Sequence, residues 1–457
     1  MDFLASDALR GRGSGTPDEL LAATYVGSQL EQYGVEPAGD HGTYVQRTAV
    51  ERQTLTAPPQ LRFMTPGDGI PAQQILWTHG KEMLTLYLSA TNFKGPLKRV
   101  HTDRGGPSLE QTAWYGSSAQ EGPDLATTAG TVVLILGKDH KKIRAAAFAA
   151  VGSGATAVLV PASPDALKSW DERGKELPKL PKKLEGSVAV PALDAGNANV
   201  FALSNEALAS LNGIPDGTMI YFDAEVGAPE KGYTWSALGK ITGSDPLLRK
   251  SAILLSAHLD HLGIGPAVNG DSIYNGADDD ASGTVAVLEL ARALASGAKP
   301  KRTVLFALFG SEEDGELGAS WFEEQPPVAL TEIAANLEFE MIGRPDPMYP
   351  GDSLWLSGWE RSNLGPALAA HGAKLVPDRR PEEHFFMRSD NYVLAKKSVV
   401  AQTASSFGLH ADYHQPSDDI AHIDFRHMTA VIGSLIGPVE WLVNSDFRPQ
   451  WKAGGKP

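Results

Sequence analysis

Acidic residues and histidines follow two apolar runs of strand length in this sequence. The segment SAILLSAHLDHLG places His258 and Asp260 after the first run. The segment KRTVLFALFGSEEDG places Glu312 and Glu313 after the second. Carboxylate oxygens and imidazole nitrogens, in a chain without cysteine, are the ligands of a hydrolytic zinc centre. These residue types therefore predict metal-assisted hydrolysis.

A strand–helix–strand unit is expected to position these residues. Apolar runs at residues 252–257 and 303–309 have strand length, and residues 281–296 between them have helix length. This order predicts a βαβ unit whose parallel strands are buried on both faces. Sites in open α/β sheets form at the carboxyl ends of the strands. The acidic run at residues 278–280, just before the helix, is expected at the same edge.

Each acidic group taken alone has a simpler explanation. The run at residues 278–280 suits the start of an exposed helix, because carboxylates there interact favourably with the helix dipole. Glu312 and Glu313 would suit any polar loop. The groups recur, however, at the ends of consecutive buried strands, and this favours one shared site over a solvated surface.

The inventory of side chains is sufficient for two metal ions. Such a centre needs ligands for both ions and one bridging carboxylate. His258 and His414 can each hold one ion, and Glu313 and Glu340 can complete the two sets. One member of the run at residues 278–280 can bridge the ions.

Two further carboxylates suit supporting roles in catalysis. Glu312 is adjacent to Glu313 but points the other way on an extended backbone, so it is free to act as the general base. Asp260 lies on the same face of its strand as His258 and can orient the imidazole.

Composition limits the class of protein. The 457 residues exceed one ordinary domain, and the formal net charge of −15 argues against nucleic acid or an anionic membrane as the main partner. No segment approaches the roughly 20 apolar residues of a membrane span. The sequence leaves the oligomeric state open.

Residues from about 50 to 235 have a different character from the rest of the chain. Proline, glycine and short β-type runs dominate, with a predicted strand at residues 130–137, a helix at 141–151 and a second strand at 155–160. This region has no cluster of metal ligands and is expected to be a second, β-rich domain. Before it, Thr16 to Glu19 predict a capping box at the start of a helix.

Five segments, AHLDHLG, NGADDDASG, GSEEDGELGA, NLEFEMIGRP and GLHADYHQPSDD, occur in this order between Ala257 and Asp419. They resemble the co-catalytic di-zinc exopeptidases, which include the bacterial leucyl-type aminopeptidases and the glutamate carboxypeptidase–transferrin receptor group. The segments TAGTVVLILG and SGATAVLV resemble the protease-associated domain that is often inserted in these enzymes.

The resemblance implies an α/β fold with a mixed, mostly parallel sheet, helices on both faces and an inserted protease-associated-like domain. We expect residues 1–75 to form the N-terminal part of the peptidase domain and residues 76–235 to form the insert. Residues 236–457 would form the catalytic di-zinc peptidase domain.

The resemblance also implies roles for individual residues. His258 and Glu340 would hold one Zn²⁺, and Glu313 and His414 would hold the other. Asp279 would bridge the two ions, joined to the next residue by a cis peptide bond.

Catalytic roles follow from the same resemblance. Glu312 would take a proton from the attacking water and return it to the leaving amine. Asp260 would hold the imidazole of His258, and the phenol of Tyr413 would stabilise the oxyanion. His261 is left open as either a supporting residue or a substrate contact.

The expected function is hydrolysis of N-terminal residues from peptides by a two-zinc aminopeptidase. A carboxypeptidase or dipeptidase with the same metal centre is the first alternative, and it would need converging arginines. Candidate arginines are Arg344, Arg379, Arg380 and Arg388. A single-zinc glutaminyl cyclase and a non-catalytic receptor-like scaffold are further alternatives. By analogy with relatives that carry the insert, we expect export to the periplasm or medium after signal removal, with a cytoplasmic location as the alternative.

Overall fold

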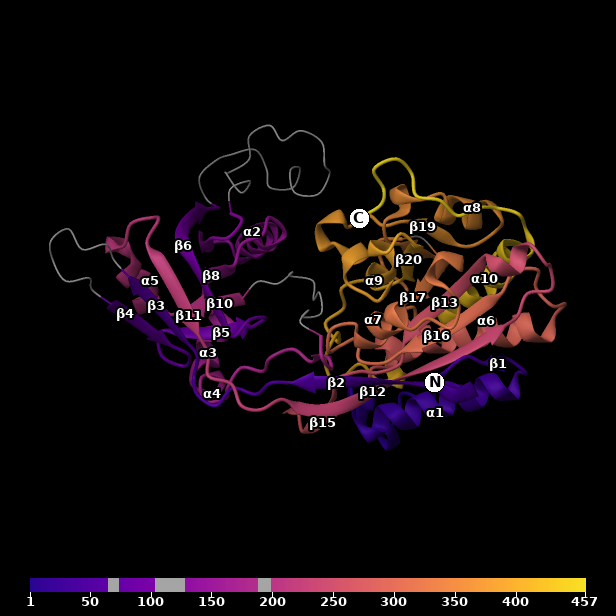
Figure 1. Ribbon diagram of the computed structural model, residues 1–457, viewed down its shortest axis with the longest axis horizontal. Helices are drawn as coiled ribbons and strands as arrows, with labels where there is room; N and C mark the ends of the chain where they lie inside the picture. The colour runs from indigo at the N-terminus through magenta and orange to yellow at the C-terminus, as the bar shows by residue number, and fades with distance from the viewer. Residues whose placement is uncertain (65–73, 103–127, 188–198, 350) are drawn as a thin grey trace. The chain divides into compact units, whose positions relative to one another are not determined.

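The computed structural model describes residues 1–64, 74–102, 128–187, 199–349 and 351–457. The chain forms two compact units (Figure 1). Unit 1 comprises residues 1–50 and 232–457, and unit 2 comprises residues 51–231. No helix among these described residues is long and apolar enough to cross a lipid bilayer.

A mixed sheet forms the centre of unit 1. Its strand order is β19 (Leu375–Pro377), β18 (Leu354–Leu356), β20 (Val400–Ser405), β17 (Ile333–Phe339), β13 (Ala252–His258), β16 (Val304–Phe309), β12 (Glu230–Ile241) and β2 (Val45–Arg52). The four strands β20, β17, β13 and β16 are parallel to their neighbours in this set, whereas β12 and β18 pair antiparallel with β16 and β20. The predicted α/β class is confirmed.

Helices cover both faces of this sheet. Ile253 and Leu255 of β13 pack in one apolar core with helices α1 (Pro17–Gln32), α6 (Gly283–Ser296), α8 (Leu364–Ala370) and α10 (Phe425–Asn444). Leu254 points to the other face, as alternation along a strand requires. It packs in a second core with α7 (Leu317–Glu324) and α9 (Asn391–Lys396).

The predicted βαβ unit is present, with one change at the start of its helix. Strands β13 and β16 pair in parallel, and α6 connects them. The α-helix begins at Gly283 rather than at residue 281, because Asp279 and Asp280 have non-helical backbone angles within a π-helical turn at Ala277–Ser282. This turn holds the acidic run in place before the helix.

Unit 2 is built on its own sheet, in the order β4 (Gln74–Thr78), β3 (Gln60–Met64), β11 (Met219–Asp223), β6 (Asn92–His101), β7 (Val132–Leu136), β8 (Ala157–Pro161), β10 (Asn199–Leu203) and β5 (Met83–Tyr87). Helices α2 (His140–Gly152), α3 (Pro164–Lys168), α4 (Trp170–Arg173) and α5 (Asn205–Ser210) complete the unit.

The division of the chain differs from the expected boundaries of 75/76 and 235/236. Strand β3 pairs with β4 and β11, so residues 60–64 belong to unit 2 rather than to the peptidase domain. Identification of unit 2 as a protease-associated-like domain stays a prediction.

Candidate metal centre

Neighbouring parallel strands carry the predicted metal ligands to one edge of the sheet. His258 is the last residue of β13, and Glu340 directly follows β17. Glu313 lies in the loop after β16, and Asp279 lies in the turn before α6. Since β16, β13 and β17 are adjacent and parallel, their carboxyl ends meet at this edge.

One group of possible ligand atoms comes from His258, Asp279 and Glu340, whose nearest donor atoms all lie within 4.8 Å of one another. The Nε2 atom of His258 is 3.2 Å from Oδ1 of Asp279. Both His258 and Asp279 are buried. The carboxylate of Glu340 therefore reaches the same place as the imidazole of His258.

The other carboxylate oxygen of Asp279 faces a second group. Nε2 of His414 lies 3.2 Å from Asp279 Oδ2 and 3.2 Å from Glu313 Oε2. His261 approaches the same carboxylates, with its Nδ1 atom 2.8 Å from Glu313 Oε1, and it also satisfies the spacing of a metal ligand with Asp279 and Glu313. Asp279 thus stands between two groups, with one oxygen toward each.

Several buried polar atoms at the centre are compatible with a bound cation. Both ring nitrogens of His258 and of His261 are buried and make no well-oriented hydrogen bond to any residue that the structure describes, although carboxylate oxygens lie within 4 Å of three of these four nitrogens. Leaving such atoms unpaired is costly, whereas a divalent cation would take their lone pairs. The donor set of imidazoles and carboxylates therefore fits two divalent metal ions that share Asp279.

The carboxylates and imidazoles strongly alter one another's pKa values. Burial alone would lower the pKa of His414, but Glu313 and Asp279 raise it to about 10. Burial would raise the pKa of Glu313, but His414 and His261 bring it down to about 2. Burial raises the pKa of Glu340 to about 8, although His258 opposes the shift. A proton on His414 therefore neutralises charge that a metal ion would otherwise balance.

Asp260 connects His258 to the loop after β16. Its Oδ1 atom accepts a hydrogen bond from the backbone N–H of Glu312 at 3.0 Å and lies 3.7 Å from Nδ1 of His258. Its Oδ2 atom accepts from Ser14 Oγ at 2.5 Å and from the backbone N–H of Glu313 at 3.4 Å. Asp260 therefore holds the loop backbone at Glu312 and Glu313, and its negative charge lies next to the imidazole of His258.

The residue Glu312 as a whole is partly exposed, but its carboxyl group is buried, and this burial raises the pKa of the group well above the ordinary value. Glu313 and Glu340 add to this rise, whereas His258 opposes it. The peptide bond between Asp279 and Asp280 is cis, as the resemblance implied.

A buried ion pair supports the turn that carries Asp279. Asp418 accepts hydrogen bonds from the backbone N–H groups of Asp278 and Asp279. Arg344 donates to Asp418 at 3.0 Å and to Asp412 at 2.6 Å. The sequence suggested Arg344 as a candidate to bind substrate carboxylates, but its guanidinium instead joins the turn to the loop that carries His414.

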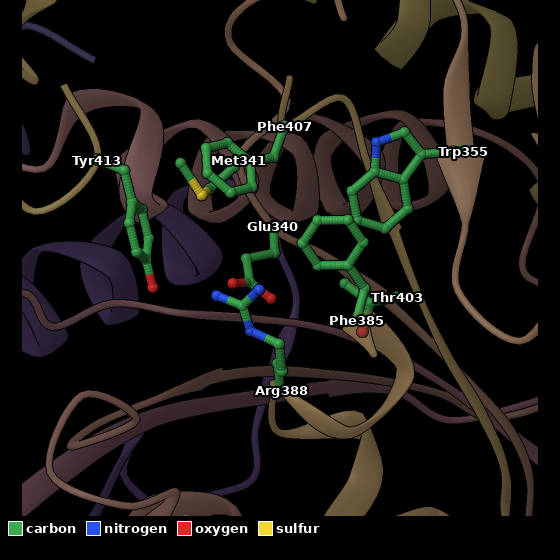
Figure 2. A pocket seen from close by; sticks show the side chains of 8 residues that line it. All are labelled: Glu340, Met341, Trp355, Phe385, Arg388, Thr403, Phe407 and Tyr413. Atoms are coloured by element: carbon green, nitrogen blue, oxygen red, sulfur yellow. The ribbon is translucent and has the colours of Figure 1, made fainter. Parts of the chain in front are cut away.

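A small recess opens beside the centre. Figure 2 shows Glu340, Arg388 and Tyr413 pointing into it. Its lining consists of Glu340, Met341, Trp355, Phe385, Arg388, Thr403, Phe407 and Tyr413. The ring of Tyr413 stacks on that of His414 with centroids 3.8 Å apart. Burial raises the pKa of the Tyr413 phenol, so the hydroxyl stays protonated and can donate a hydrogen bond.

The four candidate arginines do not converge on this recess. Arg344 pairs with Asp412 and Asp418, and Arg380 makes two hydrogen bonds to Asp346. The guanidinium of Arg379 lies over the ring of Tyr349. Of the four, Arg388 lines the recess. Apart from Glu340, Arg388 and Tyr413, the residues of the recess wall had no signal in the sequence, because they come from separate strands and loops.

A sheet-edge centre of buried imidazoles and carboxylates is the arrangement of a metallohydrolase. The model of "Peptidase family M28" matches residues 237–436, so this chain contains a peptidase family M28 domain. The match spans all eight predicted metal and catalytic residues, which are His258, Asp260, Asp279, Glu312, Glu313, Glu340, Tyr413 and His414.

Curated relatives match parts of the chain. Leupeptin-inactivating enzyme 1 of Streptomyces exfoliatus is 34% identical over 109 residues, which are 23% of this chain and 22% of that protein. The "Probable lipoprotein aminopeptidase LpqL" of Mycobacterium tuberculosis is 30% identical over 211 residues, which are 38% of this chain and 39% of that protein. The chain thus aligns with less than half the length of either relative.

A solved structure shares the fold over nearly the whole chain. The aminopeptidase from Aneurinibacillus sp. strain AM-1 aligns with a TM-score of 0.53 at 18% identity, covering 97% of this chain and 92% of that one. At this identity the likeness establishes the fold.

Proposed function

We propose that this chain is a metal-dependent aminopeptidase that uses two zinc ions. His258 and Glu340 would hold one ion, Glu313 and His414 would hold the other, and Asp279 would be shared between them. The main observation behind this proposal is the position of Asp279. Its Oδ1 atom lies 3.2 Å from Nε2 of His258, and its Oδ2 atom lies 3.2 Å from Nε2 of His414. The family M28 domain supports this assignment.

Bound zinc supplies Lewis-acid polarisation of a carbonyl group and lowers the pKa of water. The chain's own residues handle the protons. The carboxylate of Glu312 accepts a proton from the attacking water and later donates it to the leaving amine, and its raised pKa suits this exchange. The protonated hydroxyl of Tyr413 donates to the developing oxyanion. Asp260 positions the imidazole of His258 and the backbone of Glu312 relative to each other.

Recognition of an amino terminus is favoured over recognition of a carboxyl terminus. The centre is rich in carboxylates, which attract a substrate ammonium group. A carboxypeptidase would need converging arginines, and Arg344 and Arg380 are engaged by aspartates instead. The name of the relative LpqL supports the same choice. The presence of two groups of candidate ligands favours a two-metal peptidase over a single-zinc cyclase or a receptor-like scaffold.

The test compares leucine p-nitroanilide with its N-acetyl derivative before and after removal of metal by a chelator. We expect hydrolysis of the free amine alone, loss of activity after chelation, and recovery on addition of zinc. Hydrolysis confined to N-blocked peptides would refute the aminopeptidase and revive the carboxypeptidase alternative.

We also propose that the protein is exported. This proposal rests on the resemblance of residues 76–235 to a protease-associated domain and on the lipoprotein relative. Fractionation of the native cells should recover the peptidase outside the cytoplasm, and recovery in the cytoplasm would contradict the proposal.

A further inference from the structure

Each backbone N–H group in the segment from Ser311 to Glu313, which contains the proposed base, donates to a buried carboxylate. The N–H of Ser311 donates to Oε1 of Glu19 at 2.9 Å. The N–H of Glu312 donates to Oδ1 of Asp260 at 3.0 Å, and that of Glu313 donates to Oδ2 of Asp260 at 3.4 Å. Glu19 and Asp260 are both fully buried. Two carboxylates therefore fix the backbone of this segment.

Glu19 lies in helix α1 and takes no part in the proposed proton transfers, yet donors from remote segments surround its carboxylate. Its Oε2 atom accepts hydrogen bonds from the backbone N–H groups of Gly15 at 3.0 Å and of Trp235 at 3.2 Å. The hydroxyl of Thr234 lies 2.8 Å from Oε1 and 2.9 Å from Oε2. Because rotation of the carboxylate would leave buried donors unpaired, these contacts fix its orientation.

The backbone around Ser311 is shaped to meet this carboxylate. Ser311 has a φ of 53°, in the left-handed region, and such a conformation persists only where its surroundings hold it. Gly310 precedes it, and a Cβ atom at position 310 would lie 2.8 Å from Oε1 of Glu19 and 2.5 Å from the carbonyl oxygen of Trp235. Glycine therefore permits the close approach of Glu19, two residues before Glu312.

We propose that Glu19 is a positioning residue for Glu312. This role rests on the function proposed above, in which Glu312 is the base. Glu19 holds the amide of Ser311, Asp260 holds the two amides that follow, and together they fix the backbone from which the side chain of Glu312 extends. Displacement of a reacting group by about 1 Å can lower a rate by about 10²-fold, so a change at Glu19 should slow catalysis through the base.

The experiment compares wild type, Glu19→Gln, Glu312→Gln and the double variant, all as the zinc-loaded full chain, in hydrolysis of leucine p-nitroanilide. Glu19→Gln places an amide nitrogen against backbone N–H donors, from which it cannot accept a hydrogen bond. We expect kcat to fall by about 10–100-fold, with KM within about twofold of wild type. In the Glu312→Gln background, the same substitution should change kcat by less than about threefold, because the group that it positions is already absent.

Arg302→Met is the matched control for loss of a buried charged group. Arg302 lies before β16, at the opposite end of this strand from the segment, and donates to the carbonyl oxygens of Ser251 and Ser445. Its substitution should lower the free energy of unfolding and leave kcat at the wild-type value. Hydrogen–deuterium exchange on the same proteins gives a readout besides activity. Residues 310–316 should exchange faster in Glu19→Gln than in wild type, whereas residues 252–258 of β13 should exchange equally in both.

Several results would overturn this role and leave the aminopeptidase intact. They are a wild-type kcat in Glu19→Gln, an equal fall of kcat in Arg302→Met, an undiminished fall in the Glu312→Gln background, and unchanged exchange at residues 310–316. Loss of zinc from Glu19→Gln would also overturn it, since the carboxylate would then act on ligand Glu313. Failure of wild type to hydrolyse the substrate would overturn the proposed function together with this role.

A second variant covers the case in which Glu19→Gln does not fold. Thr234→Val removes the hydroxyl that contacts both carboxylate oxygens of Glu19 and keeps the shape of the side chain. It should lower kcat with little change in KM, and equal kcat in Thr234→Val and wild type would then overturn the role of Glu19.

Discussion

The Oδ2 atom of Asp418 lies 3.0 Å from the backbone nitrogen of Asp279, the residue between the two groups of candidate ligands. Arg344 in turn donates to Asp418 and to Asp412 in the loop that carries His414. One guanidinium therefore holds together two segments that are remote in sequence.

Arg344→Leu should weaken zinc binding, because it leaves Asp418 buried without its ion-pair partner and loosens the turn at Asp279. Removal of an outer hydrogen-bonding partner typically lowers metal affinity by about 10–100-fold. Competition with a chromophoric chelator measures this loss. Arg426→Leu is the matched control, since it removes an arginine that is 72% exposed and pairs with Asp352 at the surface. Equal zinc affinity in the two variants would show that Arg344 does not support the centre.

Glu312→Gln should lower kcat by roughly 10²–10⁴-fold or more, because the amide cannot accept the proton of the attacking water. Zinc content should stay that of wild type, since Glu312 is not among the proposed ligands. Steady-state kinetics and elemental analysis on the same sample test both statements. The exposed Glu324→Gln serves as control. A Glu312→Gln enzyme with wild-type kcat would refute the assigned base.

Substitution of the two histidines near Glu313 should have different effects. His414 approaches both Asp279 and Glu313 at 3.2 Å, whereas His261 lies 2.8 Å from Glu313 and farther, at 3.8 Å, from Asp279. His414→Ala should therefore lose one equivalent of zinc. His261→Ala should retain two equivalents with affinity weakened by about 10–100-fold, as expected for a residue that orients a ligand.

The exposed His371→Ala is the control for these measurements. Loss of one zinc equivalent in His261→Ala, with full content in His414→Ala, would exchange the two assignments.

Zinc binding to the metal-free chain should release protons at pH 7. The pKa of His414 is raised to about 10 and that of Glu340 to about 8, so both groups hold protons at pH 7 that a metal must displace. Zinc affinity should therefore increase as the pH rises from 6 to 8 and more gradually up to 10. Calorimetry in buffers of different ionisation enthalpy counts the protons. Binding without proton release at pH 7 would contradict these protonation states.

The shifted pKa values of His414 and Glu313 make the stability of the metal-free chain depend on pH, and the direction of each contribution follows from the direction of the shift. Because the folded pKa of His414 exceeds its ordinary value, its contribution is fully present below pH 6.5 and is lost as the pH rises toward 10. Because the folded pKa of Glu313 is depressed, its contribution is present above pH 4.5 and is lost as the pH falls toward 2. Urea unfolding of the chelated chain between pH 5 and 10 should show a decline toward the alkaline end, and the decline should be smaller in His414→Ala.

The central part of the fold could be predicted because local pattern and topology agree there. Apolar runs mark β13 and β16, and the charged residues that follow them must lie at the edge where parallel strands end. The position of Glu313 follows from this rule. The start of α6 was predicted two residues early, because Asp279 and Asp280 leave the helical backbone to form the turn.

Contacts between remote segments could not be predicted. The capping box at Thr16 to Glu19 was wrong: the hydroxyl of Thr16 donates to the Gly13 carbonyl, and Glu19 is buried. Glu19 accepts hydrogen bonds from Thr234 and from the backbone N–H of Ser311, next to the proposed base. These partners lie more than two hundred residues away, so no local pattern indicates them.

The most direct test of the account is a crystal structure of the zinc-loaded protein with anomalous scattering data collected at the zinc edge. We predict two anomalous peaks that share Asp279, one bound by His258 and Glu340 and the other by Glu313 and His414. A single peak, or zinc bound elsewhere while these five side chains pair only with one another, would contradict the two-zinc centre on which the proposed hydrolysis depends.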